Sequence, residues 1–308
     1  MPFVTCCLAQ PPQHPGGPGR PPGPGQGRPL STVKPTHADL AYATKSPAQK
    51  LDLYLPKNAK APFPVIVMIH GGAFLFGDKA DGMGLAGVDS LLEAGFAVAS
   101  INYRLSGEAS YPAQIFDAKT AVRFLRAQAA TYQLDPTRFG AWGASAGGNL
   151  ASLLGTTGGV AELEGAELGH ADQSSRVQAV VDWFGPIDFL KMQEQAGPGS
   201  RAAHTNDASS PESRLLGAPI QSIPQKVALT NPINFITPDD APFLIENGSD
   251  DRHIPPIQNQ MLAEQLTRVL GKEKVIHHTL EGAGHGGPAF ETSENLQRVI
   301  DFFQKHLR

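Results

Sequence analysis

The chain has 308 residues, of which 41% are hydrophobic and 18% charged, and its net charge at pH 7 is −4. This length and composition suffice for one large hydrophobic core and are common among single α/β domains. The slightly acidic balance gives no electrostatic attraction for nucleic acid or for an anionic membrane, so neither is expected as a partner. No apolar run approaches the ~20 residues that span a bilayer.

The first 34 residues differ in composition from the rest of the chain. From Pro11 to Pro29 most residues are proline or glycine, and such a segment has no apolar pattern with which to dock on a core. We therefore expect a disordered tail over residues 1–34, followed by one folded domain over residues 35–308.

The tail also bears on location in the cell. Residues 1–10 are too short for a complete export signal, but a Pro/Gly linker often follows such a signal. A secreted or periplasmic location is therefore one expectation, and a cytoplasmic location stays open. The two cysteines, Cys6 and Cys7, are adjacent and lie in this tail, so they cannot form a disulfide framework for the domain.

Strand and helix signals alternate along the rest of the chain. The expected strands are 37–44, 48–55, 64–69, 96–101, 138–142, 177–184, 242–247 and 274–280. The expected helices are 112–131, 147–154, 256–270 and 289–306. The first two strands should pair antiparallel, and strands separated by helices indicate a parallel sheet. The prediction is an α/β fold with a mostly parallel eight-stranded sheet and helices on both faces.

The stretch 186–236 interrupts this alternation with proline, glycine, serine and other polar residues. Long irregular segments in compact domains are usually functional or contain short helices. We expect a small insertion over the active site that forms part of the substrate wall, without the large apolar helices of a lipase lid. Three aromatic residues are candidates for the substrate pocket, although each is also a plausible core residue: Phe74, Trp183 and Phe184.

The pattern Gly143-Ala144-Ser145-Ala146-Gly147 lies between an apolar strand and the start of a helix. A serine at such a sharp turn presents its hydroxyl at the carboxyl edge of the sheet, and the two glycines allow strand and helix to approach closely. The start of the helix also directs backbone N–H groups at that point. Ser145 is therefore the candidate nucleophile. An ordinary Gly/Ser turn is the alternative for the pattern in isolation.

A second motif, His70-Gly71-Gly72-Ala73, follows the apolar run 63–69. Consecutive glycines can turn backbone N–H groups toward an oxyanion, where each donor is worth about 2.7–4 kcal/mol in related chemistry. The candidate donors are the amides of Gly72, Ala73 and Ala146. We expect His70 to shape this loop by hydrogen bonding rather than to act as a base.

Acid and base candidates follow the last two strands. The spacing Gly248-x-x-Asp251-x-x-Ile254-Pro255 favours Asp251 over its neighbour Asp250 as the acid. His285 lies in a glycine-rich loop after the last strand, a setting that none of the other nine histidines shares. The role of His253, two residues after the acid, is left open.

Two further observations narrow the chemistry. The order Ser145, Asp251, His285 along the chain is that of the α/β-hydrolases. The chain contains neither a His-Glu-x-x-His motif nor a Cys/His cluster, so no metal and no cofactor are expected.

These motifs carry a resemblance to a known family. The chain resembles the hormone-sensitive-lipase-like esterases, and more closely the bacterial dual feruloyl/acetyl-xylan esterase type. The matching stretches, which cover roughly residues 37–308, include 70–74, 77–79, 103–109, 111–114, Asp117, 143–148, 210–213 and 282–286. Ala73 replaces a third glycine, and Asn149 stands where a histidine often follows. The resemblance implies an α/β-hydrolase fold and a Ser145–Asp251–His285 triad.

The function expected from the residues and the resemblance together is hydrolysis of carboxylic esters. The substrates would be short-chain or aromatic esters of the acetyl or feruloyl type, including those of plant cell-wall carbohydrate. The alternatives are a peptidase of the prolyl-oligopeptidase type, a catalytically inactive binding protein on the same fold, and a thioesterase or lactonase. The natural ester and the oligomeric state do not follow from the sequence.

Overall fold

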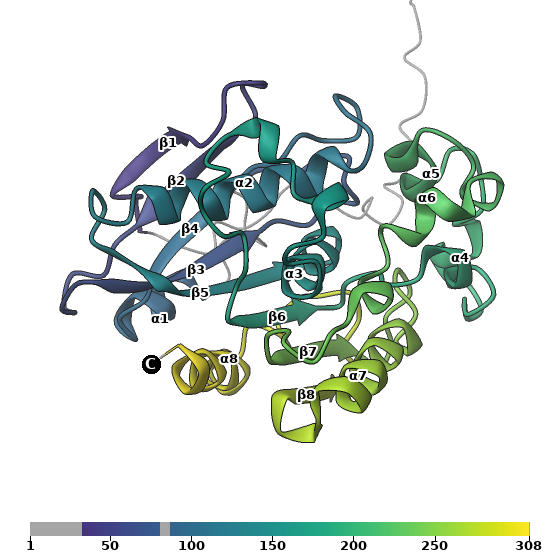
Figure 1. Cartoon of the computed structure of the whole chain (residues 1–308). Helices are drawn as coiled ribbons and strands as arrows, with labels where there is room; N and C mark the ends of the chain where they lie inside the picture. Colours follow the sequence, from purple (N-terminus) through teal and green to yellow (C-terminus); the bar gives the residue numbers. More distant parts are fainter. Residues whose placement is uncertain (1–32, 81–86, 308) are drawn as a thin grey trace, which may run out of the picture.

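The computed structural model describes residues 33–80 and 87–307. These residues contain an eight-stranded sheet in the order β1-β2-β4-β3-β5-β6-β7-β8 (Figure 1). The strands are β1 (His37–Ala41), β2 (Lys50–Tyr54), β3 (Phe63–Ile69), β4 (Ala97–Ile101), β5 (Leu134–Ala144), β6 (Ala179–Trp183), β7 (Phe243–Gly248) and β8 (Val275–Leu280). The predictions for the 1–34 tail fall almost entirely outside the described residues.

The sheet begins with two antiparallel strand pairs and continues with parallel pairs. β1 pairs antiparallel with β2, and β2 antiparallel with β4, whereas all pairs from β4 to β8 are parallel. The central strands are buried on both faces, as their continuous apolar runs predict. The predicted α/β-hydrolase architecture, with its opening antiparallel pair, is confirmed.

Helices cover both faces of the sheet. They are α1 (Val88–Glu93), α2 (Ala113–Ala127), α3 (Ala146–Thr156), α7 (Ile257–Leu270) and α8 (Ser293–His306). Apolar side chains of α2, α3 and α7 pack in one core cluster, and those of α1 and α8 in the cluster on the other face. In Figure 1, α8 (yellow) lies below the sheet and α2 above it. The sheet is therefore the middle layer of three.

Several boundaries differ from the sequence prediction. β5 begins at Leu134, four residues early, and α1 has no counterpart among the predicted helices. α8 begins at Ser293 rather than at residue 289, because the side chain of Thr292 accepts a hydrogen bond from the amide of Asn295 and caps the helix there. No helix in residues 33–80 or 87–307 is long and apolar enough to cross a bilayer.

The segment 186–236 forms short helices rather than a structureless loop. They include α4 (Phe189–Met192), α5 (Pro211–Leu216) and α6 (Pro224–Ala228). Figure 1 shows these three helices (green) grouped together at the right of the sheet. Each is six residues or shorter, so the segment lacks the long apolar helix of a lipase lid, as predicted.

Candidate active site

Ser145 lies at the turn between β5 and α3, with φ 57° and ψ −123°. This positive φ is a strained conformation for a non-glycine residue, and such strain is concentrated at functional sites. The flanking glycines permit it. A Cβ on Gly143 would lie 2.0 Å from the carbonyl oxygen of Gly147, and a Cβ on Gly147 would lie 2.0 Å from that of Ile69.

The three candidate triad side chains meet at this turn. The Nε2 atom of His285 lies 2.9 Å from the Oγ atom of Ser145, and its Nδ1 atom lies 2.7 Å from Oδ2 of Asp251. Both distances are those of hydrogen bonds. These residues are 140 and 34 positions apart in sequence, so the sheet topology brings them together.

The structure distinguishes Asp251 from Asp250. The carboxylate of Asp251 is buried, and its Oδ1 atom accepts hydrogen bonds from the amides of His253, at 2.7 Å, and Ile254, at 3.0 Å. The second oxygen is thereby directed at His285. Asp250 is exposed, and its amide donates to the carbonyl of Ala283 at 2.9 Å. Its position is that of a loop residue, as the sequence spacing indicated.

The loop after β3 has an unusual backbone. Gly72, Ala73 and Phe74 have φ values of 106°, 54° and 60°. A Cβ on Gly72 would lie 2.0 Å from the carbonyl oxygen of Phe76, so this close turn requires glycine. Gly72 and Ala73 line the same cavity as Ser145 and Ala146, where the sequence places the oxyanion donors.

The His70 ring lies beneath this loop rather than in the cavity. It stacks on the ring of Tyr103 with centroids 4.4 Å apart, and its Nδ1 atom lies 2.7 Å from the carbonyl oxygen of Gly71. The Tyr103 hydroxyl donates to the carbonyl of His70 at 3.1 Å. These contacts agree with a role in shaping the loop.

A cavity of about 570 Å³ opens above Ser145 and His285. Its size is that of a small-molecule site. The loop after β3 and segment 186–236 supply most of its wall. The lining residues are Gly72, Ala73, Phe74, Phe76, Ser145, Ala146, Pro186, Met192, Arg201, Ala202, His204, Thr205, Asp207, Ser209, Ser210, Pro211, Glu212, His253, Ile254 and His285.

Of the three predicted pocket aromatics, Phe74 lines this cavity, and Trp183 and Phe184 do not. Trp183 is buried in the core, where its indole N–H donates to Oε2 of Glu246 at 2.6 Å. Phe184 packs its ring edge-on against the imidazole of His285, with centroids 4.7 Å apart. The structure therefore places these two residues outside the cavity wall, because Trp183 is held in the core by Glu246 and Phe184 packs against His285.

His253 is a cavity residue whose role the sequence left open. Its ring meets that of His285 edge-on, with centroids 4.8 Å apart. Burial lowers the pKa of His253, and the neighbouring His285 and Arg201 lower it further. The only sequence signal for His253 was its position two residues after Asp251. The structure explains that position, because the amide of His253 donates to Oδ1 of Asp251.

The site also contains three neighbouring side chains of the kinds that can bind a metal ion. Ligand atoms of Asp251, His253 and His285 lie within 4.8 Å of one another, the one such group in the described part of the chain. Both Asp251 oxygens and both His285 nitrogens already have hydrogen-bond partners within the site. A metal would have to displace these bonds, so the arrangement fits proton transfer better than metal binding.

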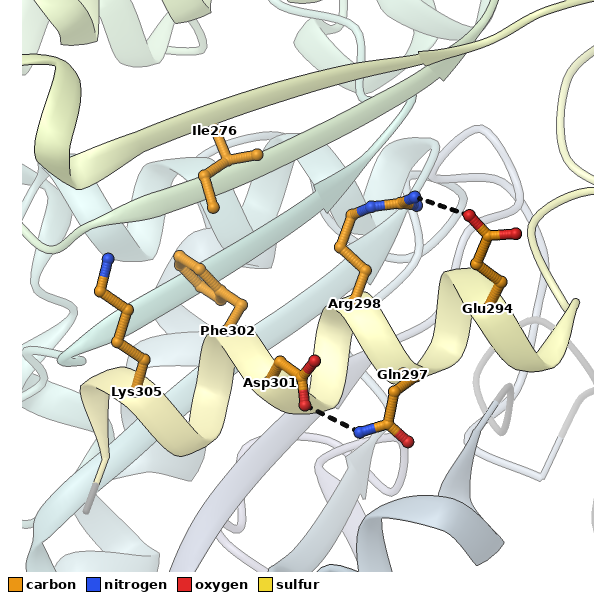
Figure 2. Close-up of a pocket in the computed structure, with 7 residues that line it drawn as sticks. All are labelled: Ile276, Glu294, Gln297, Arg298, Asp301, Phe302 and Lys305. Carbon is orange, nitrogen blue, oxygen red and sulfur yellow. Dashed lines mark hydrogen bonds and ion pairs between the residues drawn. The ribbon is translucent and has the colours of Figure 1, made fainter.

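A second cavity, of about 490 Å³, lies between β8 and α8 (Figure 2). Four of its polar side chains form two pairs. Arg298 contacts Glu294 at 3.6 Å, and the Gln297 amide donates to Asp301 at 2.8 Å. No triad residue lines this groove, and it contains no histidine, cysteine or serine that could act as a base or nucleophile.

Comparison with known families identifies the chain. The profile of the BD-FAE family matches residues 51–266, which include Ser145, Asp251 and the loop after β3. The chain belongs to the BD-FAE family. The expected hormone-sensitive-lipase-like grouping is thereby confirmed.

Curated relatives of this BD-FAE member include esterase LipC of Mycobacterium tuberculosis. The two are 32% identical over 241 residues, which are 78% of this chain and 57% of LipC. A probable carboxylic ester hydrolase of the same organism, LipM, is 28% identical over 80% of this chain and 55% of its own length. The chain therefore spans little more than half the length of these relatives.

Solved structures show the same architecture. A truncated carbohydrate esterase from gut microbiota is 35% identical with a TM-score of 0.82, over 91% of this chain and 99% of its own. A bifunctional GH43-CE protein of Bacteroides eggerthii is 38% identical with a TM-score of 0.79, over 88% of this chain and 35% of its own.

Proposed function

We propose that this BD-FAE member is a serine carboxylic-ester hydrolase that works through an acyl-enzyme on Ser145. The observation that carries the proposal is the pair of contacts at His285, 2.9 Å to Ser145 and 2.7 Å to Asp251, at the base of an open cavity. A nucleophile, a base in contact with it and an acid in contact with the base are the requirements of this chemistry. The esterase relatives support the same conclusion.

In the proposed mechanism, Ser145 donates its hydroxyl proton to Nε2 of His285 and attacks the ester carbonyl carbon. Asp251 accepts a hydrogen bond from Nδ1–H, which selects the tautomer with a free Nε2 and stabilises the imidazolium that forms. The imidazolium then protonates the departing alcohol. Water, deprotonated by His285, attacks the acyl-enzyme, and Ser145 leaves as the alcohol with its proton restored.

The carbonyl oxygen becomes negative in both tetrahedral intermediates. The amides of Gly72, Ala73 and Ala146 are the proposed donors, because all three residues border the cavity next to Ser145. Donors held in place before the reaction need no reorganisation as the charge develops. The positive φ of Ala73 and the glycine at position 72 are the backbone features that form this loop.

We further propose short-chain or aromatic esters of carbohydrate as the substrates. The cavity is large enough for a small acyl group and part of a sugar or an aromatic ring. Carbohydrate esterases among the structural relatives support this substrate class. The described domain would carry the whole reaction, since the nucleophile, base, acid and oxyanion donors all lie within it.

The test is hydrolysis of p-nitrophenyl esters from acetate to decanoate, followed by methyl ferulate and acetylated xylan. We expect the highest kcat/KM with acyl chains of a few carbons, and a loss of at least about 10³-fold in Ser145→Ala with unchanged circular dichroism. Cleavage of peptides with no ester hydrolysis would favour the peptidase alternative. Binding of esters without turnover would favour an inactive relative, and a preference for thioesters or lactones would identify those activities.

A further inference from the structure

Two segments of the chain supply cavity walls of different polarity. The loop after β3 supplies the small residues 72 and 73 and two phenylalanines. Residues 201–212 supply nine lining residues, of which seven are polar or charged: Arg201, His204, Thr205, Asp207, Ser209, Ser210 and Glu212. Several of these groups pair within the wall: His204 contacts Asp207 at 3.2 Å, and the Thr205 hydroxyl donates to the carbonyl of Ala202 at 2.8 Å.

Glu212 is distinct among these polar residues. The other charged side chains of this wall, Arg201 and Asp207, are exposed, whereas Glu212 is only 8% exposed. Within residues 33–80 and 87–307, no lysine, arginine or histidine nitrogen lies within 4.0 Å of its carboxyl oxygens. Burying a carboxyl group without a cation costs free energy unless hydrogen bonds compensate for the lost water.

The start of helix α5 accounts only in part for the burial of Glu212, whose carboxyl is contacted there by its own amide and by the Ser210 hydroxyl. Ser210 already caps this helix, because its hydroxyl accepts the amide of Ser213 at 3.0 Å, and Pro211 occupies the first helical position. Acidic residues in the first turn interact favourably with the helix while remaining in solvent. Glu212 instead faces the cavity from a buried position.

The surrounding contacts hold this wall in place. The amide of Tyr111 donates to the carbonyl of Leu215 at 2.9 Å, and the Tyr111 hydroxyl donates to that of Leu229 at 2.6 Å. The amide of Arg201 and the hydroxyl of Ser200 both donate to the carbonyl of Arg252, at 2.8 and 3.0 Å. The last two bonds connect the wall to the loop that carries Asp251.

We propose that Glu212 is a specificity-determining residue that binds a hydroxyl group of the substrate beyond the scissile ester. The inference rests on the proposed esterase function and adds to it the group that would recognise a hydroxylated substrate. A carboxyl group is a strong hydrogen-bond partner for hydroxyls, and it can accept from them when ionised. The hydroxyl can belong to a sugar in the alcohol part or to the phenol of an aromatic acid.

The titration of Glu212 is consistent with this role. Burial raises the pKa of its carboxyl to about 7. Hydrogen bonds from the amide of Glu212 itself and from the Ser210 hydroxyl lower this pKa, but by less than burial raises it. The group thus exists in both protonation states near neutral pH, and either state can pair with a hydroxyl. The other titratable or charged groups that share the cavity are Arg201, His204, Asp207, His253 and His285.

Two matched pairs of esters test the proposal. Acetylated xylo-oligosaccharide and p-nitrophenyl acetate form the same acyl-enzyme but differ in hydroxyls on the alcohol. Methyl ferulate and methyl 3,4-dimethoxycinnamate differ only in the phenolic hydroxyl. We expect Glu212→Leu to lower kcat/KM about 10- to 100-fold more for the hydroxylated member of one pair than for its partner. The pair affected identifies the hydroxyl as that of the sugar or that of the phenol.

Two further variants complete the test. Glu212→Gln keeps the size and one acceptor oxygen, so it should recover at least part of the preference for the hydroxylated ester. Glu194→Gln, at an exposed acid of the same segment outside the cavity, should match the wild type on all four esters. Equal losses on both members of each pair, or none on any, would overturn the role of Glu212. The wild-type rate on p-nitrophenyl acetate separately tests the esterase proposal.

Discussion

The two oxygen atoms of Asp251 have different partners, and one of them is His285. One oxygen is held by two backbone amides, and the other meets the imidazole at 2.7 Å. The side chain therefore has little freedom to rotate away. This arrangement explains why the acid is found at a loop position with the spacing Gly-x-x-Asp, where the following residues turn their N–H groups back onto the carboxylate.

A comparison of two neighbouring substitutions tests this assignment. Asp251→Asn replaces the acceptor that selects the His285 tautomer, so kcat should fall by about 10³- to 10⁴-fold. Asp250→Asn alters an exposed neighbour and should change kcat less than about threefold. Steady-state hydrolysis of p-nitrophenyl acetate measures both. A larger loss in the Asp250 variant would show that the acid has been misassigned.

The sequence was sufficient to select Ser145, Asp251 and His285, which the structure brings into contact, because each lies in a local motif next to an apolar strand. It failed for Trp183 and Phe184, since the direction of a side chain at a strand end depends on strand register and on neighbouring loops. Glu212 belongs to the stretch 210–213 that matches the family, but nothing in that stretch marks it as a cavity residue. Its burial in the cavity wall depends on how segment 186–236 folds back, which no local pattern reveals.

The turn from β5 into α3 depends on the absence of side chains at two positions. Gly147 packs its Cα against the carbonyl oxygen of Ile69 at the end of β3, where an added Cβ would come within 2.0 Å. Helix α3 can thus start directly above the central strands. The same closeness brings Ala146 beside the loop after β3.

An added methyl group should separate these elements. Gly147→Ala is expected to lower the free energy of unfolding by about 3 kcal/mol and to reduce kcat, because the clash is with backbone. Gly107→Ala is the matched control, since nothing lies within 4 Å of its added Cβ, and its effect should stay within about 0.5 kcal/mol. Urea unfolding measures both variants, and equal stabilities would contradict the packing described here.

The sequence predicted the longer strands and helices but not the short helices or every boundary. The alternating strands and helices were predictable from apolar runs and turn residues, and all eight strands are present. The short α1 and the short helices between β6 and β7 were not predicted individually, because few residues per helix leave no clear period. α8 begins late because Thr292 caps it, a local signal that the prediction overlooked.

At the scale of the whole molecule, Asp182 is a buried acid that couples stability to pH. Asp182, at the end of β6, accepts hydrogen bonds from the Ser152 hydroxyl at 2.7 Å and the Gly185 amide at 2.9 Å. Burial nevertheless raises the pKa of its carboxyl to about 6. The folded state then binds a proton that the unfolded chain releases near pH 4. The contribution of Asp182 to stability is therefore lost as pH rises from about 4 to 6.

Asp182→Asn removes this proton linkage and keeps a side chain that can accept from Gly185 and donate to Ser152. The free energy of unfolding of the variant minus that of the wild type should increase between pH 4 and 6, by up to about 3 kcal/mol. Denaturant unfolding at several pH values measures the difference. A constant difference over that range would exclude Asp182 as the source.

The most direct test of the account is to trap the acyl-enzyme. Wild-type protein quenched with acid during turnover of p-nitrophenyl acetate should carry one acetyl group, located by peptide mass spectrometry on Ser145. Ser145→Ala should carry none and release no more p-nitrophenol than the uncatalysed reaction. Undiminished hydrolysis by Ser145→Ala, or an acetyl group located on another residue, would contradict the claim that this serine is the nucleophile.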